Sequence, residues 1–203
     1  MLFRSIKCPS VKSKVVVIGS RFCGRTTIIY RAVTGTFEQE IDIIVSGYEP
    51  SMKQIVIGDH CVDLEIWDQQ ATNVFMLYPR DFLSGAVVVM LVFSQDDRAS
   101  FEELKEEWFS IVRRHFDNMP ILFVVGNKND LVEERKVESE QAELYAKEIG
   151  AFYYEVSAKT GSGIEELFNR VAEESYNKLI HENNEQPSIN LSNNDSHNNG
   201  KCN

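Results

Sequence analysis

The sequence lacks the long apolar runs and the basic excess that mark membrane-spanning and nucleic-acid-binding proteins. No stretch of its 203 residues approaches the roughly 18 apolar residues of a transmembrane helix, and residues 1–14 lack the apolar run of a signal peptide. Only 21 Lys and Arg stand against 31 Asp and Glu, a formal net charge of −10. Nucleic acid and anionic membranes both attract basic patches. We therefore expect a cytoplasmic protein, soluble or peripherally attached to a membrane, that does not bind nucleic acid.

Cysteine is also scarce. The four cysteines are Cys8, Cys23, Cys61 and Cys202. They have neither the spacing of metal ligands nor the paired pattern of secreted, disulfide-rich domains. We expect free thiols in a reducing compartment.

What the chain does have is enough apolar sequence for one core, 43% of its residues, arranged in alternating runs. Apolar runs predict strands at residues 15–18, 52–57, 62–67, 86–93, 121–125 and 151–156. Helical patterns occupy residues 25–32, 101–116, 139–149 and 164–179, the second opening with a capping box at Ser100 to Glu103. This alternation predicts an α/β fold, a mostly parallel central sheet with helices on both faces.

The ends of the chain differ from this pattern. Residues 1–13 are expected to be an N-terminal extension, and residues 14–179 to be the single folded domain. Residues 180–203 are rich in asparagine and poor in apolar side chains, so we expect a disordered tail.

Residues 14–27 have the layout of a strand, a glycine-framed loop and a helix start, which is the layout of the phosphate loop of P-loop NTPases. The residues predicted to bind phosphate are Gly19, Ser20, Arg21, Phe22, Cys23, Gly24, Arg25, Thr26 and Thr27. Thr26 is placed to ligate Mg²⁺. Arg25 occupies the lysine position of G-x-x-x-x-G-K-[ST], and its bulkier fork predicts weakened phosphate binding. The alternative is a strand-to-helix turn whose two glycines serve the backbone alone.

Two polar loops that follow successive strands predict a guanine site. The Asp130 carboxylate can accept hydrogen bonds from N1–H and the exocyclic amine of guanine, while Asn127 can meet its carbonyl and N7 face. Lys128 is long enough to lie along the ring. The next such loop contains Ser157, Ala158 and Lys159, and the Ala158 N–H can bond the guanine carbonyl. The alternative is a pair of ordinary polar turns.

With these motifs the chain resembles a Ras-superfamily small GTPase over roughly residues 14–179, and is most similar to the Rab family. The Rab-like features are Ile66-Trp67-Asp68, Phe-Leu-Ser-Gly-Ala at residues 82–86, Ser100-Phe101, Trp108, and Val-Ser-Ala-Lys-Thr-Gly at residues 156–161. The resemblance implies a Ras-like G domain that binds GTP or GDP with Mg²⁺. It also implies effector and exchange proteins that bind the switch regions, and vesicle traffic at the cytosolic face of endomembranes.

The switch segments depart from the family pattern. The resemblance makes Asp68 the Mg²⁺-associated aspartate. It places the switch I hydroxyl at Ser46 by Ras-like spacing, or at Val45, which has no hydroxyl, by Rab-like spacing. Where the family reads D-T-A-G-Q, Ala71 replaces the glycine that meets the γ-phosphate, and Thr72 replaces the glutamine that orients the attacking water.

These substitutions predict slow or absent GTP hydrolysis with guanine binding retained. Arg21, Arg25, Ala71 and Thr72 all touch the phosphate chemistry, whereas the base-reading residues are intact. Arg21 would either crowd out an incoming arginine finger or supply positive charge in cis. A partner protein can stimulate GTP hydrolysis on the order of 10⁵-fold, and these substitutions could forfeit that stimulation.

Two functional interpretations remain open, and a third is disfavoured. One is a regulated Rab-like switch, and the other is a pseudo-GTPase interaction module that binds partners independently of hydrolysis. An adenine-nucleotide enzyme built on the same loop conflicts with Asn127 and Asp130, which read guanine.

The C-terminus carries a weak lipidation signal. Rab-like proteins usually end in two prenylated cysteines, but here Lys201-Cys202-Asn203 offers one. A single lipid on Cys202 would give marginal, reversible membrane attachment. An unmodified Cys202 is the equal alternative.

Overall fold

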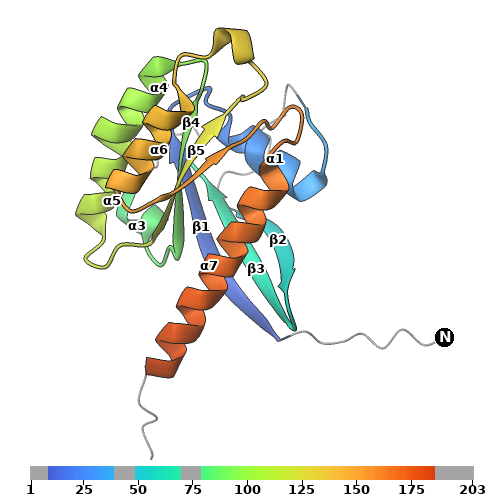
Figure 1. Ribbon diagram of the computed structural model, residues 1–203. Helices are drawn as coiled ribbons and strands as arrows, with labels where there is room; N and C mark the ends of the chain where they lie inside the picture. The colour runs from blue at the N-terminus through green and yellow to red at the C-terminus, as the bar shows by residue number, and fades with distance from the viewer. Residues whose placement is uncertain (1–8, 39–48, 70–78, 186–203) are drawn as a thin grey trace, which may run out of the picture.

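The computed structural model describes residues 9–38, 49–69 and 79–185. Within these ranges, six strands form one sheet in the order β2-β3-β1-β4-β5-β6 (Figure 1). The strands are β1 (Ser10–Gly19), β2 (Ser51–Ile57), β3 (His60–Asp68), β4 (Val88–Ser94), β5 (Ile121–Asn127) and β6 (Phe152–Glu155). Only the β2–β3 pair is antiparallel. The predicted mostly parallel sheet is confirmed.

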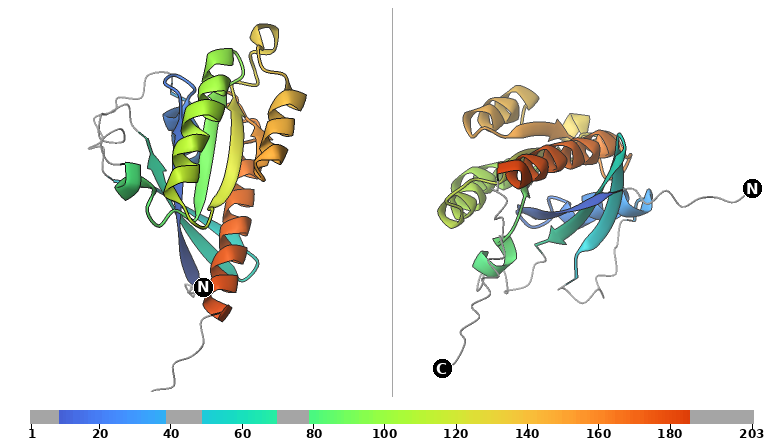
Figure 2. Two further views of the ribbon diagram at one scale, coloured as in Figure 1. Left: turned by 90° about the vertical axis from the view of Figure 1, so that its left-hand side faces the viewer. Right: turned by 90° about the horizontal axis from the view of Figure 1, so that it is seen from below.

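Helices cover both faces of the sheet. They are α1 (Arg25–Thr34), α3 (Pro79–Leu83), α4 (Arg98–Glu103), the π-helical turn η1 (Leu104–Trp108), α5 (Phe109–His115), the short 3₁₀ turn η2 (Val132–Glu134), α6 (Ser139–Glu148) and α7 (Ile164–Glu185). Figures 1 and 2 show α1 and α7 on one side of the sheet and α4, α5 and α6 on the other. The three-layer α/β architecture is as expected.

The central strands explain why both faces are covered. In β1, Val15 and Val17 point into the core beneath α1 and α7, while Val16 and Ile18 point into the core beneath α4 and α6. All seven residues of β4 are buried. Side chains alternate between the faces of a strand, so a continuous apolar run needs a helix layer on each side.

The folded part extends beyond the expected boundaries at both ends. Strand β1 begins at Ser10, which pairs with Cys61 of β3, so residues 10–13 are strand rather than extension. Helix α7 continues to Glu185, six residues past 179. Adding a turn to a helix that is already docked costs little, because no new nucleus is needed.

Two local expectations are wrong. Asp97, not Ser100, caps the second predicted helix: its side chain accepts a hydrogen bond from the Ala99 N–H at 3.0 Å. Ser100 lies inside the helix, buried, and its hydroxyl donates to the Asp97 carbonyl at 2.7 Å. The cysteines are not all free thiols either: Cys23 is free and buried, but Cys61 is disulfide-bonded.

The parallel strands bring their carboxyl ends to one edge of the sheet. Strands β1, β4, β5 and β6 are each followed there by a polar loop, and β3 ends at the same edge. Ligands of open α/β sheets bind at this edge.

In the described parts of the chain, no helix is both long and apolar enough to cross a membrane.

Candidate nucleotide site

A cavity of about 420 Å³ lies at the carboxyl edge of the sheet. Its lining residues are Phe22, Gly24, Thr27, Phe37, Asn127, Lys128, Asp130, Leu131, Ala158 and Lys159. They come from the loop after β1, the first turn of α1, the segment after α1, the end of β5, and the loops after β5 and β6. The volume falls in the range of small-molecule sites. The structure thus brings the predicted phosphate loop and the predicted base-reading loops to one cavity.

The phosphate loop wraps tightly around the start of α1. Gly24 caps this helix with φ of 90°, and no side chain caps its first N–H groups. These N–H groups and the helix dipole favour an anion. A Cβ on Gly24 would lie 2.2 Å from Nδ2 of Asn127. Glycine is needed here both for the backbone conformation and for the approach of Asn127.

Phe22 is the unusual residue of the loop. Its φ is 64°, which is uncommon for a non-glycine residue, and its side chain is 88% exposed. Neighbouring Ser20 is buried, and its hydroxyl donates to Oε2 of Glu103 in α4 at 2.5 Å. The loop is therefore anchored to a helix of the opposite layer while Phe22 faces outward.

The guanidinium of Arg25 is buried, so the crevice does accommodate it. Its Nη1 donates to the Gly19 carbonyl and, at 2.6 Å, to the Ser20 carbonyl, while Nη2 donates to the Gln69 carbonyl at 2.7 Å. Its Nε lies 3.5 Å from Oδ1 of Asp68. Whether phosphate binding is weakened remains a prediction, but the bulk of the side chain is no obstacle to folding.

Thr26 and Asp68 face each other, as the Mg²⁺ assignment requires. The Thr26 hydroxyl donates to Oδ2 of Asp68 at 2.5 Å. Burial raises the pKa of the Asp68 carboxyl, more than the Thr26 hydrogen bond and the charge of Arg25 lower it. Oδ1 of Asp68 is buried and has no hydrogen bond. A carboxylate and a hydroxyl that face each other form an oxygen donor pair that suits Mg²⁺.

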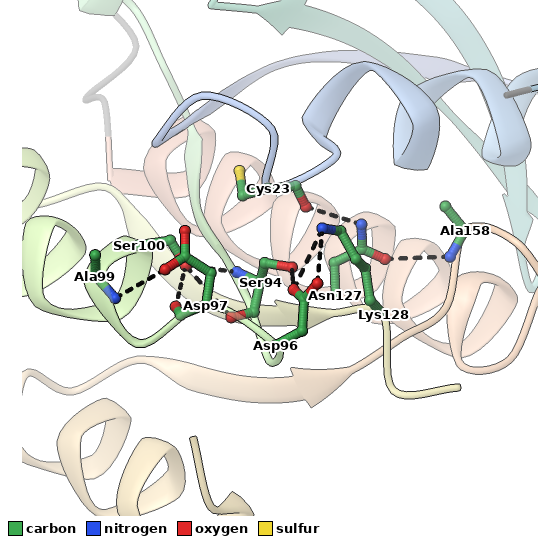
Figure 3. A network of polar contacts seen from close by, with 9 residues as sticks. All are labelled: Cys23, Ser94, Asp96, Asp97, Ala99, Ser100, Asn127, Lys128 and Ala158. Carbon is green, nitrogen blue, oxygen red and sulfur yellow. Dashed lines mark hydrogen bonds and ion pairs between the residues drawn. The ribbon is translucent and has the colours of Figure 1, made fainter. Parts of the chain in front are cut away.

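Asn127 joins three segments of the site (Figure 3). Its Nδ2 donates to the Cys23 carbonyl of the phosphate loop at 2.9 Å, and its Oδ1 accepts from the Ala158 N–H at 3.2 Å. The side chain is 2% exposed. Asn127 therefore fixes the distance between the phosphate and base parts of the site. Contacts of Asn127 and Ala158 with guanine remain predictions.

Lys128 has a partner that the sequence reasoning missed. It adopts φ of 65°, and its Nζ lies 3.3 Å from each carboxylate oxygen of Asp96 (Figure 3). Burial acts to raise the pKa of Asp96, but hydrogen bonds from Ser94 and Lys128 and the lysine charge outweigh it and lower that pKa. The only sequence signal was an acidic pair just after a buried strand.

Asp130 is held in place by the neighbouring loop. The Ser157 hydroxyl donates to Oδ1 of Asp130 at 2.6 Å, and Ser157 accepts in turn from the Thr160 N–H at 3.0 Å. The Asn129 N–H donates to the Val156 carbonyl at 3.0 Å. The loops after β5 and β6 are thus one connected unit, with the Asp130 carboxylate at the cavity wall.

A second unpredicted network supports these loops from behind. Arg135 reaches both carboxylate oxygens of Glu155 at 3.1 Å, and the Tyr153 hydroxyl donates to Glu155 at 2.7 Å. Burial opposes ionisation of Glu155, yet hydrogen bonds from Arg135, Ser139 and Tyr153 lower its pKa to about 2. Burial and Glu155 raise the pKa of Tyr153. The partners lie far apart in sequence, so spacing gave no signal.

Comparison with known proteins identifies the architecture around this cavity. The profile of the Ras family matches residues 14–177. The chain belongs to the Ras family. It is also 29% identical over 163 residues to the Ras-related protein RABF2b of Arabidopsis thaliana, covering 80% of each chain. The predicted Rab-like resemblance and the Ras-like G-domain fold are confirmed.

Some predicted site residues of this Ras-family protein lie outside the described residues. They are Ser46 and its alternative Val45 in switch I, Ala71 and Thr72 in switch II, and Cys202 at the C-terminus. Their roles remain predictions from the sequence. Of the remaining predicted residues, Lys159 and Thr27 line the cavity.

Two further residues of this Ras-family protein join the site without having been predicted. Phe37, 36% exposed, contributes an aromatic wall to the cavity, suited to stacking on a base. Gln69 is buried, and its Oε1 accepts from the Gly19 N–H at 3.2 Å. An aromatic residue shortly after the first helix was a signal for Phe37, but nothing in the sequence pointed to Gln69.

Proposed function

We propose that this Ras-family protein is a Rab-like, guanine-nucleotide-dependent switch in intracellular vesicle and membrane traffic, with slow GTP hydrolysis. The observation that carries the proposal is the linked pair Asn127 and Asp130. Asn127 ties the base-reading loop to the phosphate loop, and Ser157 orients the Asp130 carboxylate at the wall of the same cavity. One ligand with a base and a phosphate group would meet both.

Guanine suits this wall better than adenine does. A carboxylate accepts hydrogen bonds, and guanine presents two adjacent donors on its Watson–Crick edge, N1–H and the exocyclic amine. Adenine has an acceptor at N1, so it would leave the Asp130 charge unpaired. A site built around a buried hydrogen-bonding group rejects the analogue that lacks the matching donor.

The oxygen donors at the phosphate end fit Mg²⁺. Thr26 and Asp68 would hold the ion, which would neutralise charge between phosphate oxygens. The uncapped N–H groups of α1 and the buried guanidinium of Arg25 supply positive potential from the protein itself. GTP, GDP and Mg²⁺ are thus the ligands we propose for this chain.

Slow hydrolysis follows from the residues at switch II and in the phosphate loop. Thr72 is too short to orient a water as glutamine does, and Ala71 has fewer accessible backbone conformations than glycine. Arg21 would stand beside the γ-phosphate. These substitutions leave the residues on the base side of the cavity untouched.

Effector and exchange proteins are proposed to bind at the switch regions. The described part of that surface includes Phe82, whose ring meets Trp67 edge-on with centroids 6.5 Å apart. Nζ of Lys14 lies 4.9 Å from the Trp67 ring centre. Aromatic side chains of this kind anchor protein interfaces. The assignment to membrane traffic rests on the Rab-like resemblance, and lipid attachment at Cys202 would be reversible.

Nucleotide competition followed by single-turnover hydrolysis tests the proposal. A fluorescent GDP should be displaced by GDP and GTP but not by ADP or ATP, and bound GTP should be cleaved slowly. Partners captured by the GTP-bound chain should be released from the GDP-bound chain. If ATP competed as well as GTP, the guanine assignment would fail. If the same partners bound in both states, the pseudo-GTPase interpretation would replace the switch.

A further inference from the structure

The side chain of Arg25 is fixed by the backbone of two different strands. Its Nη1 contacts the Gly19 and Ser20 carbonyls at the end of β1, and its Nη2 contacts the Gln69 carbonyl just after β3. The residue is 8% exposed. The single nitrogen of a lysine cannot occupy both nitrogen positions of this planar fork. Arg25 therefore connects the ends of β1 and β3 in addition to carrying a positive charge.

The same guanidinium stands directly against Asp68. Nε of Arg25 and Oδ1 of Asp68 are 3.5 Å apart, and both atoms are buried without a hydrogen bond. A buried pair of opposite charges is screened much less than an exposed one. The carboxylate that would help to hold Mg²⁺ thus already has a cation beside it.

Gln69 also connects the end of β3 to β1 and the phosphate loop. Its Oε1 accepts from the Gly19 N–H at 3.2 Å, while its backbone N–H donates to the Val17 carbonyl at 3.0 Å. Together with the contact of Nη2, these bonds hold the residue after Asp68 against the phosphate loop. These protein contacts help to fix the position of Asp68 relative to Thr26.

We propose that Arg25 supplies, as a built-in cation, part of the charge neutralisation that Mg²⁺ provides between phosphate and Asp68, so that nucleotide retention depends only weakly on Mg²⁺. The inference rests on the proposed function, since it concerns how bound guanine nucleotide is held. Mg²⁺ usually keeps several waters and binds proteins through only one or two carboxylates. The Arg25 guanidinium already lies 3.5 Å from one oxygen of the carboxylate that would serve here.

The test compares release of a fluorescent GDP from the full-length chain with excess Mg²⁺ and with EDTA. We expect EDTA to accelerate release by less than about threefold in the parent. In Arg25→Lys, the single nitrogen cannot contact the Gly19, Ser20 and Gln69 carbonyls and Asp68 at once, so the charge is no longer held against Asp68. EDTA should then accelerate release by about tenfold or more, the equivalent of one charge-assisted hydrogen bond. Lys53→Arg, outside the cavity, controls for a general effect of exchanging the two cations.

A second measurement uses the nucleotide-free chain. Arg25→Gln and Asp68→Asn, alone and together, form a double-mutant cycle on the unfolding equilibrium. We expect the singles to be non-additive by about tenfold in the unfolding constant, as for directly coupled charges. Additive effects would contradict a direct ion pair between Arg25 and Asp68.

The outcomes distinguish failure of this inference from failure of the proposed function. Strong acceleration by EDTA in the parent, equal to that in Arg25→Lys, overturns the inference and leaves the proposed function intact. If guanine nucleotide bound in neither buffer, the proposed function would fail, and this inference with it. If Arg25→Lys did not fold, the response of the parent to EDTA would still decide.

Discussion

Asn127, which was expected to read the base, also connects the loops of the site. One end of its amide holds the Cys23 carbonyl and the other holds the Ala158 N–H, so a substitution there disturbs three segments at once. Loss of nucleotide binding in an Asn127 variant would not by itself report on base recognition. Asp130, held through the single hydroxyl of Ser157, is the cleaner probe.

Gly24 allows a prediction with a matched control. Gly24→Ala adds a Cβ 2.2 Å from Nδ2 of Asn127, whereas Gly150→Ala, at a similarly positive φ of 70°, meets nothing within 4 Å. Both changes should lose about 1–2 kcal/mol from backbone strain, measured by urea unfolding. Only Gly24→Ala should also lose nucleotide binding, by about tenfold or more, because it displaces the Asn127 brace. Equal effects of both changes on binding would contradict this account.

The elements around the site were predictable to different degrees. Apolar runs located all six described strands. The signal was clearest for β4, which is buried along its whole length, because a strand covered on both faces must be apolar throughout. The helix expected at residues 101–116 is interrupted by the π-helical turn Leu104–Trp108, which no periodicity marks. The Lys128–Asp96 and Arg135–Glu155 pairs escaped prediction, because each joins two segments that are brought together only by strand order.

The Arg135–Glu155 network should make the free energy of unfolding depend on pH in the acidic range. The pKa of Glu155 is lowered from 4.5 to about 2, so its ionised form stabilises the fold above pH 4.5. That contribution should fade as the pH falls from about 4.5 towards 2. Because Glu155 is partly exposed, we expect about 1 kcal/mol.

Urea unfolding of the parent and of Glu155→Gln measures this contribution. The two should differ at pH 7 and converge near pH 2. Glu106→Gln, on an exposed helix position, should match the parent throughout. A difference between parent and Glu155→Gln that persisted unchanged at pH 2 would show that charge is not the cause.

At the scale of the whole molecule, the fold is that of the Ras family, while Arg25 stands where the phosphate-loop pattern has lysine. The alternation of strands and helices was enough to predict the mostly parallel sheet, and the turn at Gly58 between β2 and β3 accounts for its antiparallel edge. The consequences of Arg25 were not predictable, because they depend on three carbonyls and one carboxylate from two strands.

If switch II limits hydrolysis, restoring the family residues there should accelerate it. The double change Ala71→Gly and Thr72→Gln should raise the single-turnover rate of GTP cleavage by about tenfold or more, by returning the group that positions water. Affinity for GDP should stay within about threefold of the parent, because the base-reading loops are untouched. An unchanged rate would show that Arg21 or Arg25, and not switch II, limits GTP hydrolysis.

Exchange of base specificity at Asp130 tests the central claim most directly. Xanthine carries a carbonyl where guanine has its exocyclic amine, so an amide in Asp130→Asn can donate to it. We predict that Asp130→Asn weakens binding of fluorescent GDP by about 100-fold, the equivalent of two hydrogen bonds to a charged group, and gains binding of the xanthine analogue. Asp117→Asn, in an exposed loop, should leave both affinities unchanged. Undiminished GDP binding by Asp130→Asn would contradict guanine recognition at this cavity.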